Sequence, residues 1–433
     1  MSICAIVWDI KIDLLKKVEK QWSISVFLFN FVSVSLIYVA MKKLLLFLLL
    51  TLCASMLKAE EKHYTVVVSA DGFRWDYPLW YDTPFIDYMG REGVSSGLIP
   101  SFPSKTFPNH YTLATGLYPD HHGIVANDFY DADKDEVFSL SNAKQKMNPR
   151  FYGGEPIWVT AQRQGLHTAI FYWPGSDIKI KDCRPDLFHY YDQKPRLTYA
   201  QRIAGIVEQL KKPENERPDL IMAYLEEPDA SGHHTGPQSR RTRQAVMQVD
   251  SLIHQLYSDI QSLPVAGRVN LILLSDHGMT WVTKEHAVNL YQYLNPRWIK
   301  RAEGTVPTNI YAHTGCTDSI LTALKRVDHI KVWKKEDLPV YLHYGRSSRV
   351  GDVVAMPDLG YVINSELNGG NHGYDPTMQD MHALFRAIGP DFKQHCTVPH
   401  FENVNVYTLL CHLLRITPAE NDGNEELIKQ FTK

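Results

Sequence analysis

Three aspartates follow three short apolar runs of the chain, and this placement is the first sign of chemistry in the sequence. Asp71, Asp229 and Asp276 each stand just after such a run. In an open parallel sheet, ligands bind outside the carboxyl ends of the strands, so we expect the three carboxylates to meet at one edge. Neighbouring carboxylates repel one another and so raise one another's pKa values, and a bound cation compensates this repulsion.

Three histidines complete this set. His233 lies four residues after Asp229, His277 adjoins Asp276, and His372 stands in a glycine-flanked turn. Aspartate oxygen and histidine nitrogen are ligands that zinc uses, although the residue types alone leave manganese and iron open. Two zinc ions about 4 Å apart suit hydrolysis at phosphorus, since one activates the attacking oxygen and the other stabilises the leaving oxygen. One such residue alone would be read as a cap or a solvated turn residue, but six favour a metal centre.

Thr106 is the candidate nucleophile. It stands at the expected start of a helix that includes residues 109–115, where free backbone N–H groups favour an anion. A threonine hydroxyl becomes a good nucleophile only when it is deprotonated, and a bound divalent cation achieves this. The alternative is that Thr106 only caps the helix.

The elements that must position these residues are short strands alternating with helices. Apolar runs predict strands over residues 64–70, 168–172, 219–225, 269–275 and 381–388. Their near-continuous apolarity is typical of strands buried on both faces of a parallel sheet. Helical periodicity marks residues 199–210, 239–260 and 407–414. The alternation predicts an α/β fold, with a mainly parallel central sheet flanked by helices.

Residues from about 285 to 365 break this alternation. We predict that they form a small cap-like insertion beside the sheet, with a hairpin near residues 340–364. No repeat or low-complexity linker interrupts the chain. Residues 60–433 are therefore expected to form a single metal-dependent domain.

The N-terminal residues have the pattern of an export signal. Residues 41–59 combine two lysines, an apolar stretch and a small residue before a charged segment, which is the layout of a secretory signal peptide. We interpret residues 1–40 as an upstream extension, with Met41 as the initiator, and the alternative is an extra membrane helix over 23–40. Cys53 lacks the small preceding residue that lipidation requires, so an outer-membrane lipoprotein is disfavoured. We expect a secreted or periplasmic protein without a stable membrane span in its mature form.

The overall composition excludes several classes of protein. The 433 residues include 45 Lys and Arg against 48 Asp and Glu, and 44% are hydrophobic, as in soluble globular proteins. A disordered chain, a collagen-like repeat and a polytopic membrane protein are therefore excluded. No basic excess exists to neutralise phosphates, which argues against a protein that coats nucleic acid, and we expect no sequence-specific nucleic-acid binding. Cysteines at 183, 316, 396 and 411 could pair in an oxidising compartment or remain free thiols.

Six stretches of the chain resemble the nucleotide pyrophosphatase/phosphodiesterase family of the alkaline phosphatase superfamily. They match in order and spacing, and with the segments between them they cover residues 64–415. The stretches are ADGFRWDY (70–77), PSFPSKTFPNHYTLATGLYPDHHGIVAND (100–128), WPGSD (173–177), YLEEPDASGHHTGP (224–237), LLSDHGM (273–279) and GGNHGYDPTMQDMHALF (369–385). The resemblance implies an alkaline-phosphatase-like fold and two zinc ions per chain.

The resemblance also implies a role for each site residue. Thr106 resembles the nucleophile that forms a covalent intermediate with the nucleotidyl group. Asn127 resembles the residue whose amide, with the backbone N–H of the nucleophile, holds a phosphoryl oxygen. The implied ligands of the zinc that activates the nucleophile are Asp71, Asp276, His277 and Thr106 itself, and those of the other zinc are Asp229, His233 and His372.

The substrate class implied by the resemblance is nucleotides and their derivatives, cleaved at phosphodiester or pyrophosphate bonds to release nucleoside 5′-monophosphates. Phe107, Tyr191 and Tyr224 resemble an aromatic slot for a nucleobase, although Phe107 and Tyr224 could also be ordinary core aromatics. An aromatic cage for choline-containing phosphodiesters is the alternative within the family. A phosphomonoesterase would need extra cationic groups, and an inactive scaffold would lack a ligand or the nucleophile. The oligomeric state stays open.

Overall fold

The structure, a computed structural model, describes residues 3–56 and 61–433. The chain divides into two units, residues 1–62 and residues 63–433. The first unit contains one long helix, α1 (Ile3–Met56), and the cleavage position expected near residue 59 lies outside the described residues. No helix in the described ranges is both long enough and apolar enough to cross a membrane.

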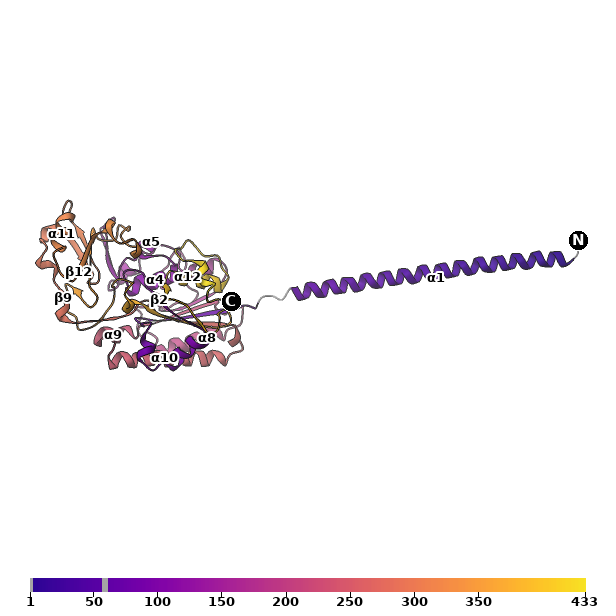
Figure 1. Cartoon of the computed structure of the whole chain (residues 1–433), viewed down its shortest axis with the longest axis horizontal. Coiled ribbons are helices and arrows are strands. Elements are labelled where there is room, and N and C mark those ends of the chain that lie inside the picture. The colour runs from indigo at the N-terminus through magenta and orange to yellow at the C-terminus, as the bar shows by residue number, and fades with distance from the viewer. Residues whose placement is uncertain (1–2, 57–60) are drawn as a thin grey trace. The chain divides into compact units, whose positions relative to one another are not determined.

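The second unit is built around an eight-stranded, mostly parallel sheet (Figure 1), as the sequence predicts. The strand order is β17-β2-β16-β7-β1-β6-β5, with β18 also paired to β2. Only β16 runs antiparallel to its neighbours β2 and β7. The strands are β1 (Tyr64–Ala70), β2 (Val94–Ile99), β5 (Thr168–Phe171), β6 (Leu220–Leu225), β7 (Val269–Leu274), β16 (Ala383–Ile388), β17 (Cys396–Thr397) and β18 (Phe401–Glu402).

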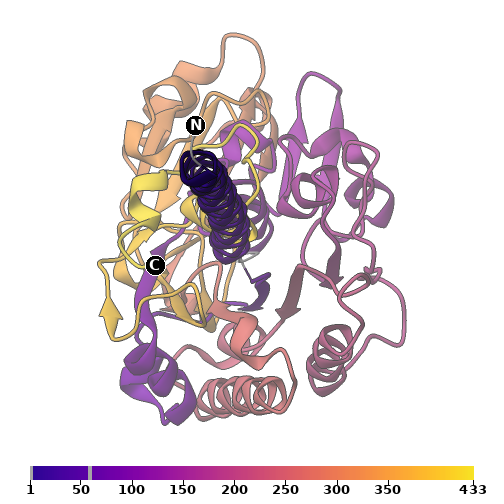
Figure 2. The ribbon, with the colours of Figure 1, turned by 90° about the vertical axis from the view of Figure 1, so that its right-hand side faces the viewer.

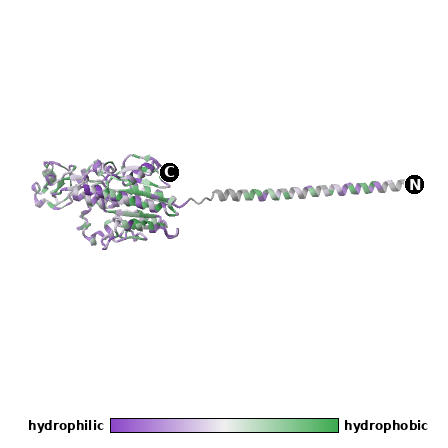
Figure 3. Cartoon of the chain, turned by 90° about the horizontal axis from the view of Figure 1, so that it is seen from below, coloured by the Kyte–Doolittle hydropathy of each residue, from purple (hydrophilic) through white to green (hydrophobic). Residues whose placement is uncertain are grey.

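Burial on both faces explains why these strands are apolar at nearly every position. In β1, Val67 belongs to a core cluster on one face, whereas Val66 and Val68 belong to a cluster on the other. Figure 3 shows hydrophobic strands in the interior of this unit with hydrophilic segments around them. The first face is covered by α4 (Thr106–Thr115), α7 (Ile157–Arg163) and α12 (Asn405–Leu414), and the second by α3 (Pro84–Glu92), α8 (Tyr199–Leu210) and α10 (Arg240–Gln261).

The flanking helices begin where the sequence provides caps. Thr198 and Gln201 form a reciprocal capping box at the start of α8, and Ser239 accepts a hydrogen bond from the Thr242 N–H at the start of α10. The other short elements are α2 (Tyr77–Trp80), α5 (Pro119–His122), β3 (Asp128–Asp131), β4 (Glu136–Ser139), α6 (Ala143–Lys146), α9 (Asp229–Thr235), β8 (Thr280–Val282), β9 (Ala287–Val288), β14 (Val362–Ile363), β15 (Gly369–Asn371) and α13 (Glu425–Ile428).

A separate four-stranded antiparallel sheet occupies much of the region from 285 to 365. Its order is β10-β11-β13-β12, and α11 (Thr317–Leu324) packs against it through Ile320 and Leu324. In Figure 2 this sheet, in orange, and the segment that includes β3 and β4, in violet, lie on opposite sides of the same end of the unit. The strands are β10 (Ile299–Glu303), β11 (Thr308–Ala312), β12 (Ile330–Lys334) and β13 (Val353–Pro357).

The hairpin predicted near residues 340–364 is wrong. β13 pairs with β11 and β12, while β14 pairs in parallel with β9. Every residue of β13 is buried, so this strand takes a central place between two partners rather than one arm of a hairpin. Alternating apolar residues mark a strand but do not choose its partner.

The cysteines at 183, 316, 396 and 411 are free thiols in the structure. Cys411 is buried in the core cluster around α12, and the other three are partly buried. None of these four therefore contributes a disulfide to the stability of the second unit.

Candidate active site

The three predicted aspartates lie together because their strands are neighbours in the sheet. Asp71 follows β1, Asp229 opens α9 after β6, and Asp276 follows β7, and these three strands are adjacent and parallel. The Asp229 N–H donates to the Asp71 carbonyl at 2.9 Å. Gly72 permits this approach, since its φ is +64° and a Cβ there would lie 2.8 Å from the Cβ of Asp229.

Asp71, Asp276 and His277 form the first group of candidate ligands. His277 Nε2 lies 3.0 Å from Asp276 Oδ2 and 3.4 Å from Asp71 Oδ1. All three side chains are buried. This is the set that the sequence assigns to the zinc beside the nucleophile.

The second group surrounds Asp229. His233 Nε2 lies 3.4 Å from Asp229 Oδ2 and 3.0 Å from His372 Nε2, and His372 Nε2 lies 3.7 Å from Asp229 Oδ1. His277 also lies close, because its ring stacks on that of His372 with centroids 3.6 Å apart. Asp229, His277 and His372 also offer ligand atoms that all lie within 4.8 Å of one another, and His233 is the most exposed member of this region.

Backbone carbonyls hold the three imidazoles in one orientation. The Nδ1 atoms of His233, His277 and His372 lie 2.9, 2.8 and 2.7 Å from the carbonyl oxygens of Gly370, Gly278 and Ser104, respectively. A carbonyl only accepts, so each Nδ1 must donate, and the neutral ring then presents an Nε2 lone pair to the cluster. This is the tautomer that a metal ligand needs.

The carboxylates of the cluster also fit a divalent cation. Within the part of the chain that the structure describes, Asp71 Oδ1, Asp229 Oδ1 and Asp276 Oδ2 are buried oxygens without a hydrogen-bond donor. Burial, with the charges of Asp276 and Asp229, raises the pKa of Asp71 well above its ordinary value. Such oxygens cost free energy unless a cation compensates them.

Thr106 lies at the border of the two groups. It is the first residue of α4, and its Oγ1 lies 3.2 Å from His277 Nε2. Asn127 lies next to it, because Asn127 Oδ1 accepts the Phe107 N–H at 3.0 Å. With its oxygen held, the Asn127 amide retains its N–H groups for another acceptor.

The three predicted aromatic residues line one pocket that opens on the nucleophile. Phe107, Tyr191 and Tyr224 share it with Thr106, and the rings of Tyr191 and Tyr224 lie 6.4 Å apart. The Tyr224 hydroxyl also donates to Asp71 Oδ2 at 2.5 Å, so this residue contacts both the pocket and the ligand cluster. The other lining residues are Leu140, Lys146, Tyr172, Trp173, Pro174, Gly175, Asp177, His189 and Asp192.

Several residues of the site were not found from the sequence. His110 lies one helical turn after Thr106 in α4, with its Nδ1 2.9 Å from the Thr106 carbonyl oxygen and 3.3 Å from Asp276 Oδ2. Its Nε2 lies 2.8 Å from the Ser69 hydroxyl. The spacing of four residues from the nucleophile was a signal for His110. At the polar end of the pocket, Asp177 ends the family-like stretch WPGSD, whereas Lys146 comes from a segment without a recognisable pattern.

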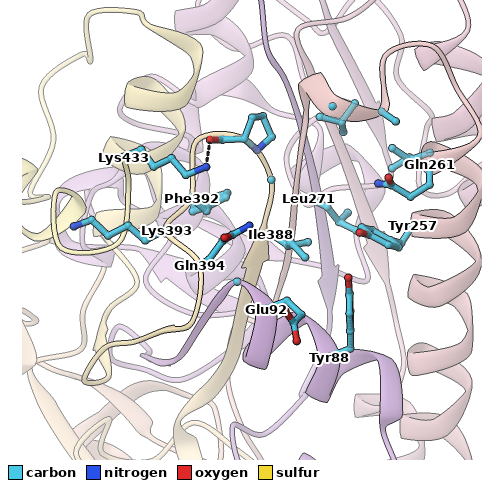
Figure 4. A pocket seen from close by; sticks show the side chains of 17 residues that line it. Tyr88, Glu92, Tyr257, Gln261, Leu271, Ile388, Phe392, Lys393, Gln394 and Lys433 are labelled. Atoms are coloured by element: carbon cyan, nitrogen blue, oxygen red, sulfur yellow. Dashed lines mark hydrogen bonds between the residues drawn. The ribbon is translucent and has the colours of Figure 1, made fainter.

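A second pocket lies elsewhere in the unit, between α3, the end of α10 and the chain after β16 (Figure 4). Tyr88, Tyr257 and Gln261 line one side, while Lys393 and Lys433 lie on the other. The two lysine ammonium groups already donate to backbone carbonyls. None of the candidate site residues lines this pocket.

The fold and the ligand cluster define an α/β protein of the alkaline-phosphatase-like type, with a site suited to divalent cations. A family model described as type I phosphodiesterase / nucleotide pyrophosphatase matches residues 65–375. The chain belongs to this family.

Relatives and solved structures agree with this assignment. Ectonucleotide pyrophosphatase/phosphodiesterase family member 3 of Bos taurus is 38% identical over 388 residues, which are 85% of this chain and 44% of the relative. Venom phosphodiesterase of Crotalus durissus collilineatus is 35% identical, over 86% of this chain and 47% of the relative. The chain thus spans less than half the length of these curated relatives.

The structure of murine ectonucleotide pyrophosphatase/phosphodiesterase 5 superimposes with a TM-score of 0.81 at 34% identity, covering 86% of this chain and all of that one. An inactive threonine-to-alanine variant of the same murine protein, in complex with AMP, superimposes with a TM-score of 0.80.

Proposed function

We propose that this protein hydrolyses phosphodiester or pyrophosphate bonds of nucleotides and their derivatives and releases nucleoside 5′-monophosphates. The observation that carries the proposal is the position of Thr106. Its hydroxyl lies 3.2 Å from His277 Nε2, at the border of two groups of candidate metal ligands, and it also lines the aromatic pocket. This arrangement suits a nucleotide, because its base can lie in the aromatic pocket while Thr106 attacks its phosphorus beside the cation site.

The cofactor in this proposal is a pair of zinc ions, with manganese or iron as alternatives of the same ligand chemistry. Asp71, Asp276 and His277, together with Thr106, would hold one ion. Asp229, His233 and His372 would hold the other. Bound there, the two ions supply positive charge that lowers the pKa of the attacking hydroxyl and stabilises the leaving oxygen.

The protein's own residues then perform a two-step displacement. Thr106 Oγ1 gives up its proton to solvent and attacks phosphorus in line, the bond to the leaving oxygen breaks with its electron pair on that oxygen, which takes up a proton from solvent where its pKa requires one, and a covalent nucleotidyl-threonine forms. Water then attacks phosphorus, returns a proton to the Thr106 oxygen and releases the 5′-monophosphate. The amide of Asn127 donates to a phosphoryl oxygen during both steps, and a neutral donor stabilises that growing charge in a preorganised way.

The pocket favours a nucleobase over a choline headgroup. The Tyr191 ring already has two cations near it, with the Arg196 guanidinium carbon 4.5 Å and Lys146 Nζ 5.4 Å from its centroid. A quaternary ammonium binds to free aromatic faces, so these protein cations oppose it. A nucleobase instead offers a flat ring and an edge of donors and acceptors, which suits the aromatic walls together with Lys146 and Asp177.

The AMP complex of the murine neighbour and its inactivation by a threonine-to-alanine change support both the nucleotide substrate and a threonine nucleophile here. An inactive scaffold is less well supported, since all six candidate ligands and the nucleophile are present. We further propose that the protein acts after export, in the periplasm or outside the cell, because of the signal-like pattern at residues 41–59.

The proposal is tested by a parallel assay of three chromogenic esters. We expect the zinc-loaded protein to cleave the p-nitrophenyl ester of thymidine 5′-monophosphate faster than p-nitrophenyl phosphate or p-nitrophenyl phosphorylcholine. Faster cleavage of the choline ester would reject the nucleotide pocket. A zinc content far below two per chain would favour the scaffold.

The variant Thr106→Ala tests the nucleophile. It should lose turnover by about four orders of magnitude or more, as when a covalent nucleophile is removed. Zinc content should stay close to that of the unmodified protein, because six other ligands remain. Normal hydrolysis by this variant would assign the attack to a different group.

A further inference from the structure

The loop that carries the nucleophile is tied to the loop that carries His372. Ser104 accepts from His372 Nδ1 through its carbonyl, at 2.7 Å, and donates through its hydroxyl to the Tyr374 carbonyl at 2.6 Å. Lys105 Nζ donates to the carbonyl of His372 itself, also at 2.6 Å. Three hydrogen bonds thus connect the two residues before Thr106 with a loop more than 260 residues later in the chain.

Lys105 is held in this place by packing as well as by its hydrogen bond. Its side chain lies against Gly373, where a Cβ would stand 2.5 Å from Lys105 Cε and 3.0 Å from Nζ. Gly373 has a φ of +112°, and a Cβ there would also stand 2.2 Å from the Val306 carbonyl oxygen, so the conformation and this backbone contact require glycine. Asn371 Oδ1 is 3.5 Å from the same ammonium, at the limit of a hydrogen bond. A partly buried, ordered lysine loses much of its rotamer entropy, which indicates a specific role for the ammonium.

The two halves of the ligand cluster are connected to Thr106 in different ways. His277 contacts the Thr106 hydroxyl directly, at 3.2 Å. His372 instead reaches the nucleophile loop through its hydrogen bonds with Ser104 and Lys105. The distance between the nucleophile and the second group of ligands therefore depends on these hydrogen bonds. In-line displacement is sensitive to that distance, since a displacement of about 1 Å can lower the rate about 100-fold.

We propose that Lys105 is a positioning residue that fixes His372, and with it the second cation site, relative to Thr106. The inference rests on the proposed function. Lys105 precedes the nucleophile in the chain and donates to the backbone of a ligand. Together with the hydrogen bonds of Ser104, it therefore sets the separation between Thr106 and the second cation site. Its charge acts on the carbonyl of His372 and leaves the imidazole free for the metal.

The test compares Lys105→Met with the unmodified protein. The first measurement is zinc binding by the metal-free proteins, in competition with a chromophoric chelator. We expect one of two zinc equivalents to bind about 10- to 100-fold more weakly in the variant, as when an outer-shell partner of a metal ligand is lost. The other equivalent should bind as before, because Asp71, Asp276 and His277 do not contact Lys105.

The second measurement is kcat for a series of thymidine 5′-monophosphate aryl esters whose leaving phenols differ in pKa. A displaced second site stabilises the leaving oxygen less, so kcat should fall most for the least acidic phenols, with KM changed less than about two-fold. A general loss of folded protein would lower all rates by one factor.

Three further variants complete the test. Lys105→Arg keeps the charge and the donor and should retain most of the zinc affinity. Lys105→Gln loses the charge and should bind zinc as weakly as Lys105→Met. If Lys105→Met does not fold, Lys105→Gln takes its place. Thr160→Val removes the buried hydrogen bonds of the Thr160 hydroxyl with Glu155 and with the Tyr407 hydroxyl, neither of which is a candidate site residue, and controls for stability alone. Unchanged zinc affinity in the folded Met or Gln variant, or an equal fall in kcat for every ester, would overturn the role of Lys105.

Absence of zinc-dependent diester hydrolysis in the unmodified protein would instead reject the proposed function, while the zinc titration would still test the inference.

Discussion

At the scale of single residues, Tyr224 connects the two parts of the site. Its ring lines the aromatic pocket, and its hydroxyl donates to Asp71 Oδ2 at 2.5 Å. Burial, followed by the charge of Asp71, raises the pKa of Tyr224 well above its ordinary value, so the hydroxyl stays protonated and remains a donor. The donor fixes one oxygen of Asp71 and leaves Oδ1 for a cation.

Replacing Tyr224 with Phe separates these two roles, because the ring remains and only the donor is lost. We expect zinc affinity and kcat to fall about 10-fold, as for other outer-shell partners, with KM for the nucleotide ester nearly unchanged. Competition with a chelator measures the first effect and steady-state kinetics the second. Tyr191→Phe is the matched control, since it removes a pocket hydroxyl without contact to Asp71 and should bind zinc normally. A raised KM with normal zinc affinity in Tyr224→Phe would show that the hydroxyl acts on substrate.

At the scale of elements, the turn after β7 is fitted against the chain that leads into β16. The N–H groups of Gly278 and Met279 donate to the carbonyls of Met381 and Asp380, both at 2.8 Å. A Cβ at Gly278 would lie 2.0 Å from the Asp380 carbonyl oxygen, a backbone atom that cannot move aside easily. Glycine is needed here for space, and the same turn carries Asp276 and His277 into the cluster.

The variant Gly278→Ala should therefore displace the turn. We expect the free energy of unfolding to fall by about 1–3 kcal/mol, the range for overpacking, and the zinc site beside Thr106 to weaken at the same time. Gly267→Ala is the matched control, because no atom lies within 4 Å of its Cβ, and it should change stability by less than about 0.5 kcal/mol. Urea unfolding and zinc titration measure both effects, and equal behaviour of the two variants would contradict the argument.

At the scale of the whole second unit, the buried His122 contributes to the response of stability to pH. His122 accepts the Ile124 N–H at Nδ1 and contacts the Thr112 hydroxyl at Nε2, and burial lowers its pKa to about 3. The unfolded chain takes up a proton near pH 6.5, but the folded protein does not until about pH 3. The stability that neutral His122 contributes is complete above pH 6.5 and is lost as the pH falls toward 3.

For this one group, the free energy of unfolding should fall by about 1.4 kcal/mol per pH unit at most. His122→Gln removes this titrating group. Between about pH 6.5 and pH 4.5, the slope of the free energy of unfolding against pH should therefore decrease by up to the contribution of one proton. Urea unfolding of the metal-free proteins at several pH values measures the slope. The exposed His412 gives the matched control His412→Gln, which should leave the slope nearly unchanged. An unaltered slope in His122→Gln would mean that other groups carry the acid sensitivity.

Much of the fold and of the site could be predicted because the signals are local. Apolar runs marked the strands at 64–70 and 269–275, since burial on both faces imposes the same requirement at each position. The hairpin near 340–364 failed because a local pattern does not specify which strand pairs with which. His233 was found from its spacing of four residues after Asp229, which we expected to span a tight loop. The structure has the helix α9 there instead, in which residues four apart lie on the same face.

The sequence by itself predicted the kinds of candidate ligands, a candidate nucleophile and the strands whose ends carry the aspartates. The tertiary structure shows what the neighbouring acid does instead: Glu226 pairs with Arg202 at 2.7 Å and with Arg196 at 2.8 Å, while Asp229 faces the cluster. It also brought Lys105 to the carbonyl of His372, 267 positions away. The reason is physical. The spacing of residues along the chain determines which side chains lie together within one turn or helix. Contacts between loops that follow different strands depend on how the sheet and its helices pack.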